Sequence, residues 1–173
     1  MSPELDAKAI LETLERHGVR FVLIGGLAGV HWGSPFPTED LDITPQRERN
    51  NLDRLSAALT ELEARIRTAS EPEGLPFAHT GASLADAQVW DLVTPYGELD
   101  ISFVPNGTAG YEDLIRDAAT DEVQGVRIRI ASLADVIRSK QAANRPKDQR
   151  VLPTLREILA SRHEQPRERR RPR

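Results

Sequence analysis

The sequence contains no cysteine among its 173 residues. This absence excludes disulfide bonds and thiolate metal sites, and it favours a reducing compartment. No apolar run approaches the roughly 20 residues that a membrane-spanning helix needs, and no basic segment followed by an apolar one marks a signal peptide. We therefore expect a cytoplasmic protein, built as one domain with at most a small appendage, that has no membrane partner.

Lysine is almost as scarce, because only Lys8, Lys140 and Lys147 stand beside 20 arginines. The formal net charge is −4, yet residues 162–173 carry six arginines against two glutamates. The rest of the chain is therefore more acidic than the total suggests, which argues against binding nucleic acid through bulk charge. The arginine-rich end either contacts phosphates or is a disordered, solvated tail, and its composition favours the second interpretation.

An apolar strand that runs into two glycines is the first chemical signal. Residues 20–24 predict a buried strand, Gly25 and Gly26 follow at once, and residues 27–32 predict a short helix. This arrangement lets backbone N–H groups approach a phosphate closely. Taken alone, two glycines are more often a tight turn.

Two carboxylates on the next predicted strand, residues 40–44, supply the second signal. Asp40 and Asp42 are two residues apart and point to the same face, whereas Leu41 and Ile43 point to the core. Adjacent carboxylates repel each other, and a divalent cation such as Mg²⁺, which prefers oxygen ligands, removes that penalty. The alternative is a pair of solvated acids on an edge strand.

The rest of the pattern mixes helices and strands and predicts an α/β protein. The expected helices run from the N-cap Ser2 to a glycine cap at Gly18, over 47–66, over 111–118, from Ser132 to a break at 144–146, and around Val151 to Leu159. The expected strands form two hairpins, of residues 88–93 with 98–104 and of residues 122–123 with 126–130. Residues 67–87 predict a long loop.

A third acid and an inward lysine follow later in the chain. Asp100 shares one face of its predicted strand with Glu98 and Ser102, so that this face is polar. Lys140 lies on the apolar face of its predicted helix, where an unpaired ammonium is costly. The triphosphate of a nucleotide would be a suitable partner, and a snorkelling lysine is the alternative.

Asp148 and Lys147 are neighbours with different expected orientations. Asp148 lies four residues before Leu152 and seven before Leu155, so it faces inward on the last predicted helix. An acid that stabilises the first turn of that helix is the alternative interpretation. Lys147 is expected to face solvent.

These motifs resemble the signature of the DNA polymerase beta-like nucleotidyltransferase superfamily. The matching segments are Ile24-Gly25-Gly26, a spacer of thirteen residues before Asp40-Leu41-Asp42-Ile43, and a third acid in Leu99-Asp100-Ile101. The resemblance covers roughly residues 20–160. Towards the C-terminus, Ser139-Lys140 and Arg145-Pro146-Lys147-Asp148 resemble the AbiEii and MenT-type toxins of bacterial toxin–antitoxin systems.

The resemblance implies a nucleotidyltransferase fold of the α/β (α+β) class, in which helices flank a small mixed twisted sheet and a helical C-terminal portion follows. Residues 1–130 would form the nucleotidyltransferase core and residues 131–161 the helical portion that completes the site. Residues 162–173 would be the disordered arginine-rich tail.

The resemblance also implies transfer of a nucleoside monophosphate from an NTP to an acceptor, with Mg²⁺ or Mn²⁺ as cofactor. The implied metal ligands are Asp40, Asp42 and Asp100. Lys140 and Asp148 would complete the catalytic set. The implied nucleotide-binding residues are Gly25, Gly26, Ser34, Thr38 and Lys140.

The acceptor implied by the toxin group is the 3′ end of tRNA, and a cognate antitoxin would then be a partner. The alternatives are a protein acceptor, a small-molecule acceptor such as an antibiotic, and a catalytically silent interaction module. One position departs from the pattern of these relatives, which often have an arginine where this chain has Phe36. We expect Arg145 or Lys140 to supply the missing positive charge near the triphosphate.

Overall fold

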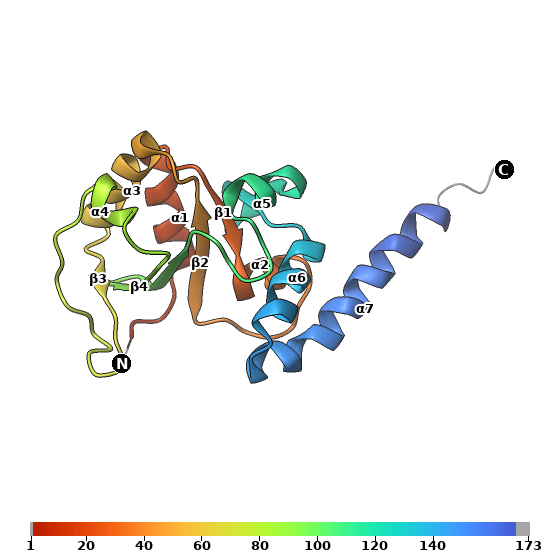
Figure 1. Cartoon of the computed structure of the whole chain (residues 1–173). Helices are drawn as coiled ribbons and strands as arrows, with labels where there is room; N and C mark the ends of the chain where they lie inside the picture. Colours follow the sequence, from red (N-terminus) through yellow and green to blue (C-terminus); the bar gives the residue numbers. More distant parts are fainter. Residues whose placement is uncertain (1, 169–173) are drawn as a thin grey trace.

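The structure is a computed structural model that describes residues 2–168 (Figure 1). Its helices are α1 (Ala7–Arg16), α2 (Gly25–His31), α3 (Arg49–Glu61), α4 (Gly81–Leu84), α5 (Tyr111–Asp117), α6 (Leu133–Ala143) and α7 (Pro146–Glu168). Its strands are β1 (Phe21–Ile24), β2 (Asp40–Pro45), β3 (Arg65–Ile66), β4 (Val89–Thr94), β5 (Gly97–Ser102), β6 (Ala119–Val123) and β7 (Val126–Ile130). The expected α/β class is confirmed.

The strands form one mixed sheet in the order β3-β4-β5-β2-β1-β7-β6. β2 runs antiparallel to β1 and parallel to β5, and β1 runs parallel to β7. The two hairpins expected from the sequence are β4 with β5 and β6 with β7. Strands from both halves of the chain therefore meet in the centre of the sheet.

The register of the central strands separates an apolar face from a polar one. Leu41 lies beside Leu99, and Ile43 lies between Leu23 and Ile101. All five side chains are completely buried, in one core with the leucines of α1 and α3. The alternation along each strand therefore turns the intervening acids of β2 and β5 to the opposite face.

The start of α1 and the end of α3 differ from those expected. α1 begins at Ala7, with the Asp6 carboxylate accepting a hydrogen bond from the backbone N–H of Ala9 at 3.0 Å, whereas the Ser2 hydroxyl donates to Glu98 instead of capping a helix. α3 ends at Glu61, because the chain turns through a positive φ at Glu63. Ile66, expected on that helix, pairs with β4 as part of β3.

The C-terminal helices meet at a sharp turn. The Ser132 hydroxyl caps α6 as expected, and Asn144 ends it in the left-handed conformation with a φ of 51°. Pro146 then begins α7. Proline has no backbone N–H, but this costs nothing at the start of a helix, where that group would have no intrahelical acceptor. α7 extends away from the sheet in Figure 1 and continues through Glu168.

Of the segment expected to be a disordered tail, residues 162–173, the structure describes residues 162–168. Residues 162–168 belong to α7, and the Arg162 guanidinium lies 4.9 Å from the centroid of the Trp32 ring. Residues 169–173 lie outside the described range. Between residues 2 and 168, no helix combines the length and the apolar character needed to cross a membrane.

Candidate active site

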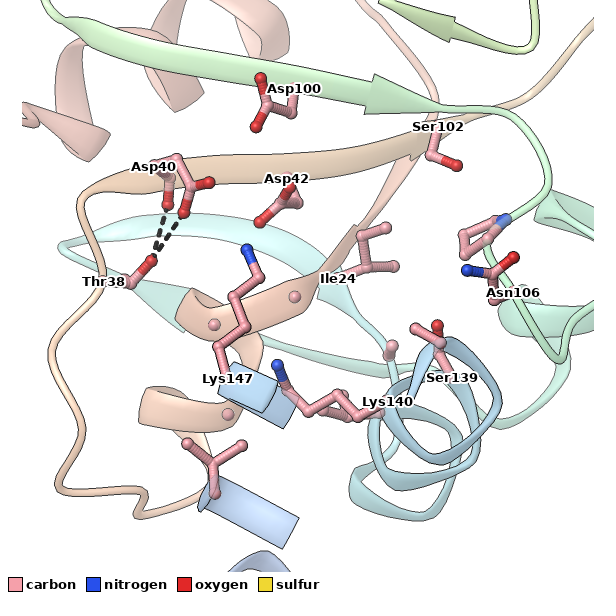
Figure 2. A pocket seen from close by; sticks show the side chains of 18 of the residues that line it. Ile24, Thr38, Asp40, Asp42, Asp100, Ser102, Asn106, Ser139, Lys140 and Lys147 are labelled. Carbon is pink, nitrogen blue, oxygen red and sulfur yellow. Dashed lines mark hydrogen bonds between the residues drawn. The ribbon is translucent and has the colours of Figure 1, made fainter. Parts of the chain in front are cut away.

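The parallel register of β2 and β5 brings three carboxylates together. Asp42 lies directly beside Asp100, and Asp40 lies two residues from Asp42 on the same face of β2 (Figure 2). Each of the three carboxylates offers an oxygen within 4.8 Å of the other two. Three oxygen ligands at this spacing suit a hard divalent cation.

The negative charge of these three carboxylates is not neutralised by other residues of the sheet. Burial, followed by repulsion from Asp40 and Asp100, raises the pKa of Asp42 to about 8. Burial also raises the pKa of Asp100 to about 7, although the nearby Arg67 guanidinium opposes the shift. A divalent cation would remove both the repulsion and the cost of burying negative charge, so the donor set fits a metal ion.

Arg67 also contacts this cluster, and the sequence did not predict that contact. Its Nη2 lies 2.6 Å from Asp100 Oδ1 and 3.5 Å from Glu98 Oε2. The residue follows β3, in a stretch expected only as a loop. Because its guanidinium holds one oxygen of Asp100, it restricts the orientation of that carboxylate.

The two glycines lie against the same carboxylates. Gly25 begins α2 at a φ of 71°, and a Cβ atom there would overlap the Asp42 carboxylate. A Cβ atom at Gly26 would lie 2.9 Å from Thr38 Oγ1. The Thr38 hydroxyl donates to Asp40 Oδ1 at 2.9 Å, as drawn in Figure 2. The glycines therefore allow the chain after β1 to pass close to the acids.

Replacing Gly25 by Ala is expected to disturb the site more than the fold. The left-handed conformation costs an L-residue about 1–2 kcal/mol, and the added methyl group also displaces Asp42. Gly125→Ala is the matched control, because Gly125 has a φ of 82° and a Cβ atom there would meet no other atom within 4 Å. Chemical denaturation should show the larger loss for Gly25→Ala, because the displaced Asp42 adds to the backbone cost, and calorimetric titration should show weakened Mg²⁺ binding in that variant alone. Equal Mg²⁺ affinity of the two variants would contradict a role for this close approach.

A cavity of about 560 Å³ opens in front of the carboxylates. Its walls come from the loop before β2, from β5 and from the α6–α7 junction. The residues singled out from the sequence that line it are Gly25, Gly26, Ser34, Phe36, Thr38, Asp40, Asp42, Asp100, Lys140 and Arg145. Phe36, with 38% of its surface exposed, lies in this wall where relatives often have arginine.

Two lysines face the carboxylates across the cavity. Lys140 is 15% exposed, and its Nζ lies 3.7 Å from Asp148 Oδ1. Lys147 also lines the cavity, and its ammonium group points toward Asp42 in Figure 2. Lys147 is exposed, as expected, but it also reaches the cavity, which was not expected. It does so because α7 begins at Pro146, which places Lys147 in a first turn directed at β2.

Asp148 faces inward, as its spacing predicted, but it lies outside the cavity lining. Its side chain is completely buried. Burial opposes its ionisation, but hydrogen bonds from the Arg145 guanidinium and backbone N–H hold the pKa of Asp148 below its usual value. The carboxylate thus joins Arg145 and Lys140, both of which line the cavity, into one cluster.

No protein-family model matches the sequence, and no curated protein does. The lincosamide antibiotic adenylyltransferase LnuA, with lincomycin bound, has a similar structure at 16% identity and a TM-score of 0.60, over 90% of this chain and 99% of that chain. The antibiotic-resistance factor ANT(2'')-Ia is similar in solution at 15% identity and a TM-score of 0.52, over 94% and 93% of the two chains. Its complex with adenylyl-2''-tobramycin gives a TM-score of 0.50 at 15% identity, over 89% and 94%.

Structural similarity at 15–16% sequence identity supports a common fold, but no conclusion about substrate or activity. LnuA is an adenylyltransferase, and both similar chains are matched over nearly their whole length. The chain has the nucleotidyltransferase fold.

Proposed function

We propose that the protein transfers a nucleoside monophosphate from an NTP to an acceptor hydroxyl, with Mg²⁺ or Mn²⁺ as cofactor. The observation that carries the proposal is the β2–β5 register, which sets Asp42 beside Asp100 and within reach of Asp40. Three acids on one wall and two lysines on the other suit a metal–triphosphate complex, because each wall neutralises charge that the other leaves unbalanced.

In this proposal the acceptor oxygen forms a bond to the α-phosphorus, and the bond from that phosphorus to the bridging oxygen breaks. Pyrophosphate leaves, and the proton of the acceptor hydroxyl passes to Asp100. Bound metal would stabilise the charge on the reacting oxygens. Lys140 and Lys147 would bind the departing phosphates, and residues 131–161 would thus complete the site.

We propose the 3′ end of tRNA as acceptor, with the protein acting as the toxin of a toxin–antitoxin pair in the cytoplasm. The support is the sequence resemblance of Ser139-Lys140 and Arg145–Asp148 to that group. The buried carboxylate of Asp148 orients two cations, Lys140 and Arg145, so that these three residues would act together. A cognate antitoxin would then be the regulatory partner.

A small cationic acceptor is the second candidate. Glu39, Asp91 and Glu98 line the cavity together with the metal-site acids, so this wall suits a positively charged molecule. Two proteins of similar fold are described as an antibiotic adenylyltransferase and an antibiotic-resistance factor.

Separate reactions with different classes of acceptor distinguish the two candidates. The protein is incubated with each α-labelled NTP, Mg²⁺ and one acceptor class: total tRNA, total protein, or an aminoglycoside and lincosamide mixture. We expect label on tRNA, and none when Asp42→Asn replaces the wild type. Label on an antibiotic instead would replace the first candidate by the second. Absence of label on every acceptor would contradict the transferase proposal.

A further inference from the structure

A second hollow, of about 490 Å³, lies at the end of the sheet where β1 and β7 begin. Phe21, at the start of β1, lines this hollow, whereas Ile24, at its end, lines the catalytic cavity. Three residues of strand separate the two by about 10 Å. α5 contributes to both, with Leu114 in the catalytic cavity and Tyr111 in the second hollow. Val22 and Leu23, which lie between them on β1, are completely buried, so a ligand that contacts both hollows must pass over the surface around α5 and be longer than this separation.

Arginines dominate the rim of the second hollow. Arg20, Arg127 and Arg129 are exposed there, and none of them forms an ion pair with an acid in residues 2–168. Arg16 and Arg138, elsewhere on the surface, are paired with carboxylates. Among the residues lining the hollow, Glu15 is the one acid. Glu122 lies opposite Arg127 in the β6–β7 ladder, so three arginines stand against two acids and leave a small local excess of positive charge in an otherwise acidic chain.

The shape of the hollow suits an extended polyanion. Arg127 and Arg129 project from the same face of β7, about 7 Å apart along the strand, and so reach successive groups of a chain. Val19 and Phe21 are almost fully buried and form an apolar floor. Tyr111 adds a partly buried aromatic ring, on which a base can stack.

We propose that this arginine groove, formed by Arg20, Tyr111, Arg127 and Arg129, binds the sugar–phosphate backbone of an RNA acceptor whose 3′ end enters the catalytic cavity. The proposal rests on the transferase function proposed above and narrows its acceptor to a nucleic acid. A small acceptor would fill the catalytic cavity and would have no use for three unpaired arginines at the other end of β1. A bound strand would also explain how an acidic protein holds RNA, through one local patch.

The test compares two double charge reversals that change the net charge equally. Arg127→Glu/Arg129→Glu removes the groove cations, whereas Lys8→Glu/Arg156→Glu reverses two exposed cations outside both hollows. Fluorescence anisotropy measures tRNA affinity at several salt concentrations for each variant. We expect the groove variant to bind tRNA about tenfold or more weakly, with a salt slope smaller by about one to two. The control should bind like the wild type.

The measured tRNA affinity does not depend on catalysis, because the same binding measurement is repeated for each variant combined with Asp42→Asn. Affinity lost there in the groove variant supports the groove even if no acceptor is ever labelled. Unchanged tRNA affinity in the groove variant would overturn the proposal, as would an equal loss in the control pair, which would indicate bulk charge alone. Arg127→Ala/Arg129→Ala, with melting temperatures alongside, guards against misfolding by the reversed charges.

Discussion

Asp42→Asn is expected to make the metal-free protein more stable at pH 8 while abolishing nucleotidyl transfer. The carboxyl of Asp42 has an ordinary pKa of 3.8 and a pKa of about 8 in the fold, because burial and the neighbouring Asp40 and Asp100 oppose its ionisation. Between those values the folded state holds a proton that the unfolded chain has lost. The free energy of unfolding therefore decreases as the pH rises through this window.

Asparagine cannot ionise, so the variant should lose this part of the pH dependence. We expect a gain of about 3–4 kcal/mol at pH 8 relative to pH 5, or a melting temperature higher by about 6–16 °C. The measurement is thermal unfolding in EDTA at both pH values, with the exposed Asp117→Asn as control. Wild type should recover stability at pH 8 when Mg²⁺ is added, because the cation replaces the proton. A parallel pH dependence in wild type and Asp42→Asn would contradict this assignment.

Lys140→Met is expected to lower kcat by about a hundredfold to a thousandfold, the usual effect of removing one group that stabilises transition-state charge. Lys140 lines the cavity and is held by the completely buried Asp148. Asp148→Asn should therefore reduce kcat as well, by releasing Lys140 and Arg145. It should also cost about 1–3 kcal/mol of stability, because charged hydrogen bonds from Arg145 are lost.

A double-mutant cycle separates the two roles. If Asp148 acts through Lys140, then Lys140→Met/Asp148→Asn should be scarcely slower than Lys140→Met alone. Each variant is compared under saturating NTP at a temperature well below its melting point, with Lys8→Met as the lysine control. Multiplication of the two single effects in the double variant would show that Asp148 acts on the reaction independently of Lys140.

The sequence predicted the parts of the site that depend on local pattern. Alternation along β2 and β5 placed Asp40, Asp42 and Asp100 on polar strand faces, and Leu41 and Ile43 in the core. Alternation alone does not specify which strands are neighbours. The adjacency of β2 and β5 comes from long-range packing, and only the resemblance to a known signature suggested it.

The residues that the sequence missed depend on backbone turns. The period of α3 continues to Ile66, but the positive φ at Glu63 sends the chain into β3 and brings Arg67 to Asp100. Lys147 faces Asp42 because α6 ends at Asn144 and α7 begins at once with Pro146. No periodic pattern encodes the turn at Glu63, and the break expected at residues 144–146 did not specify that a new helix begins at once, so neither cation was assigned to the site.

Parallel reactions with α-labelled and γ-labelled NTP test the central claim most directly. The full-length protein is incubated with Mg²⁺, tRNA and each labelled nucleotide, beside Asp42→Asn. Nucleotidyl transfer predicts that α-label appears on the acceptor and that γ-label is released as pyrophosphate, both only in the wild type. Acceptor labelled from the γ-position, or α-label transferred equally by Asp42→Asn, would contradict a nucleotidyl transfer that depends on these three carboxylates.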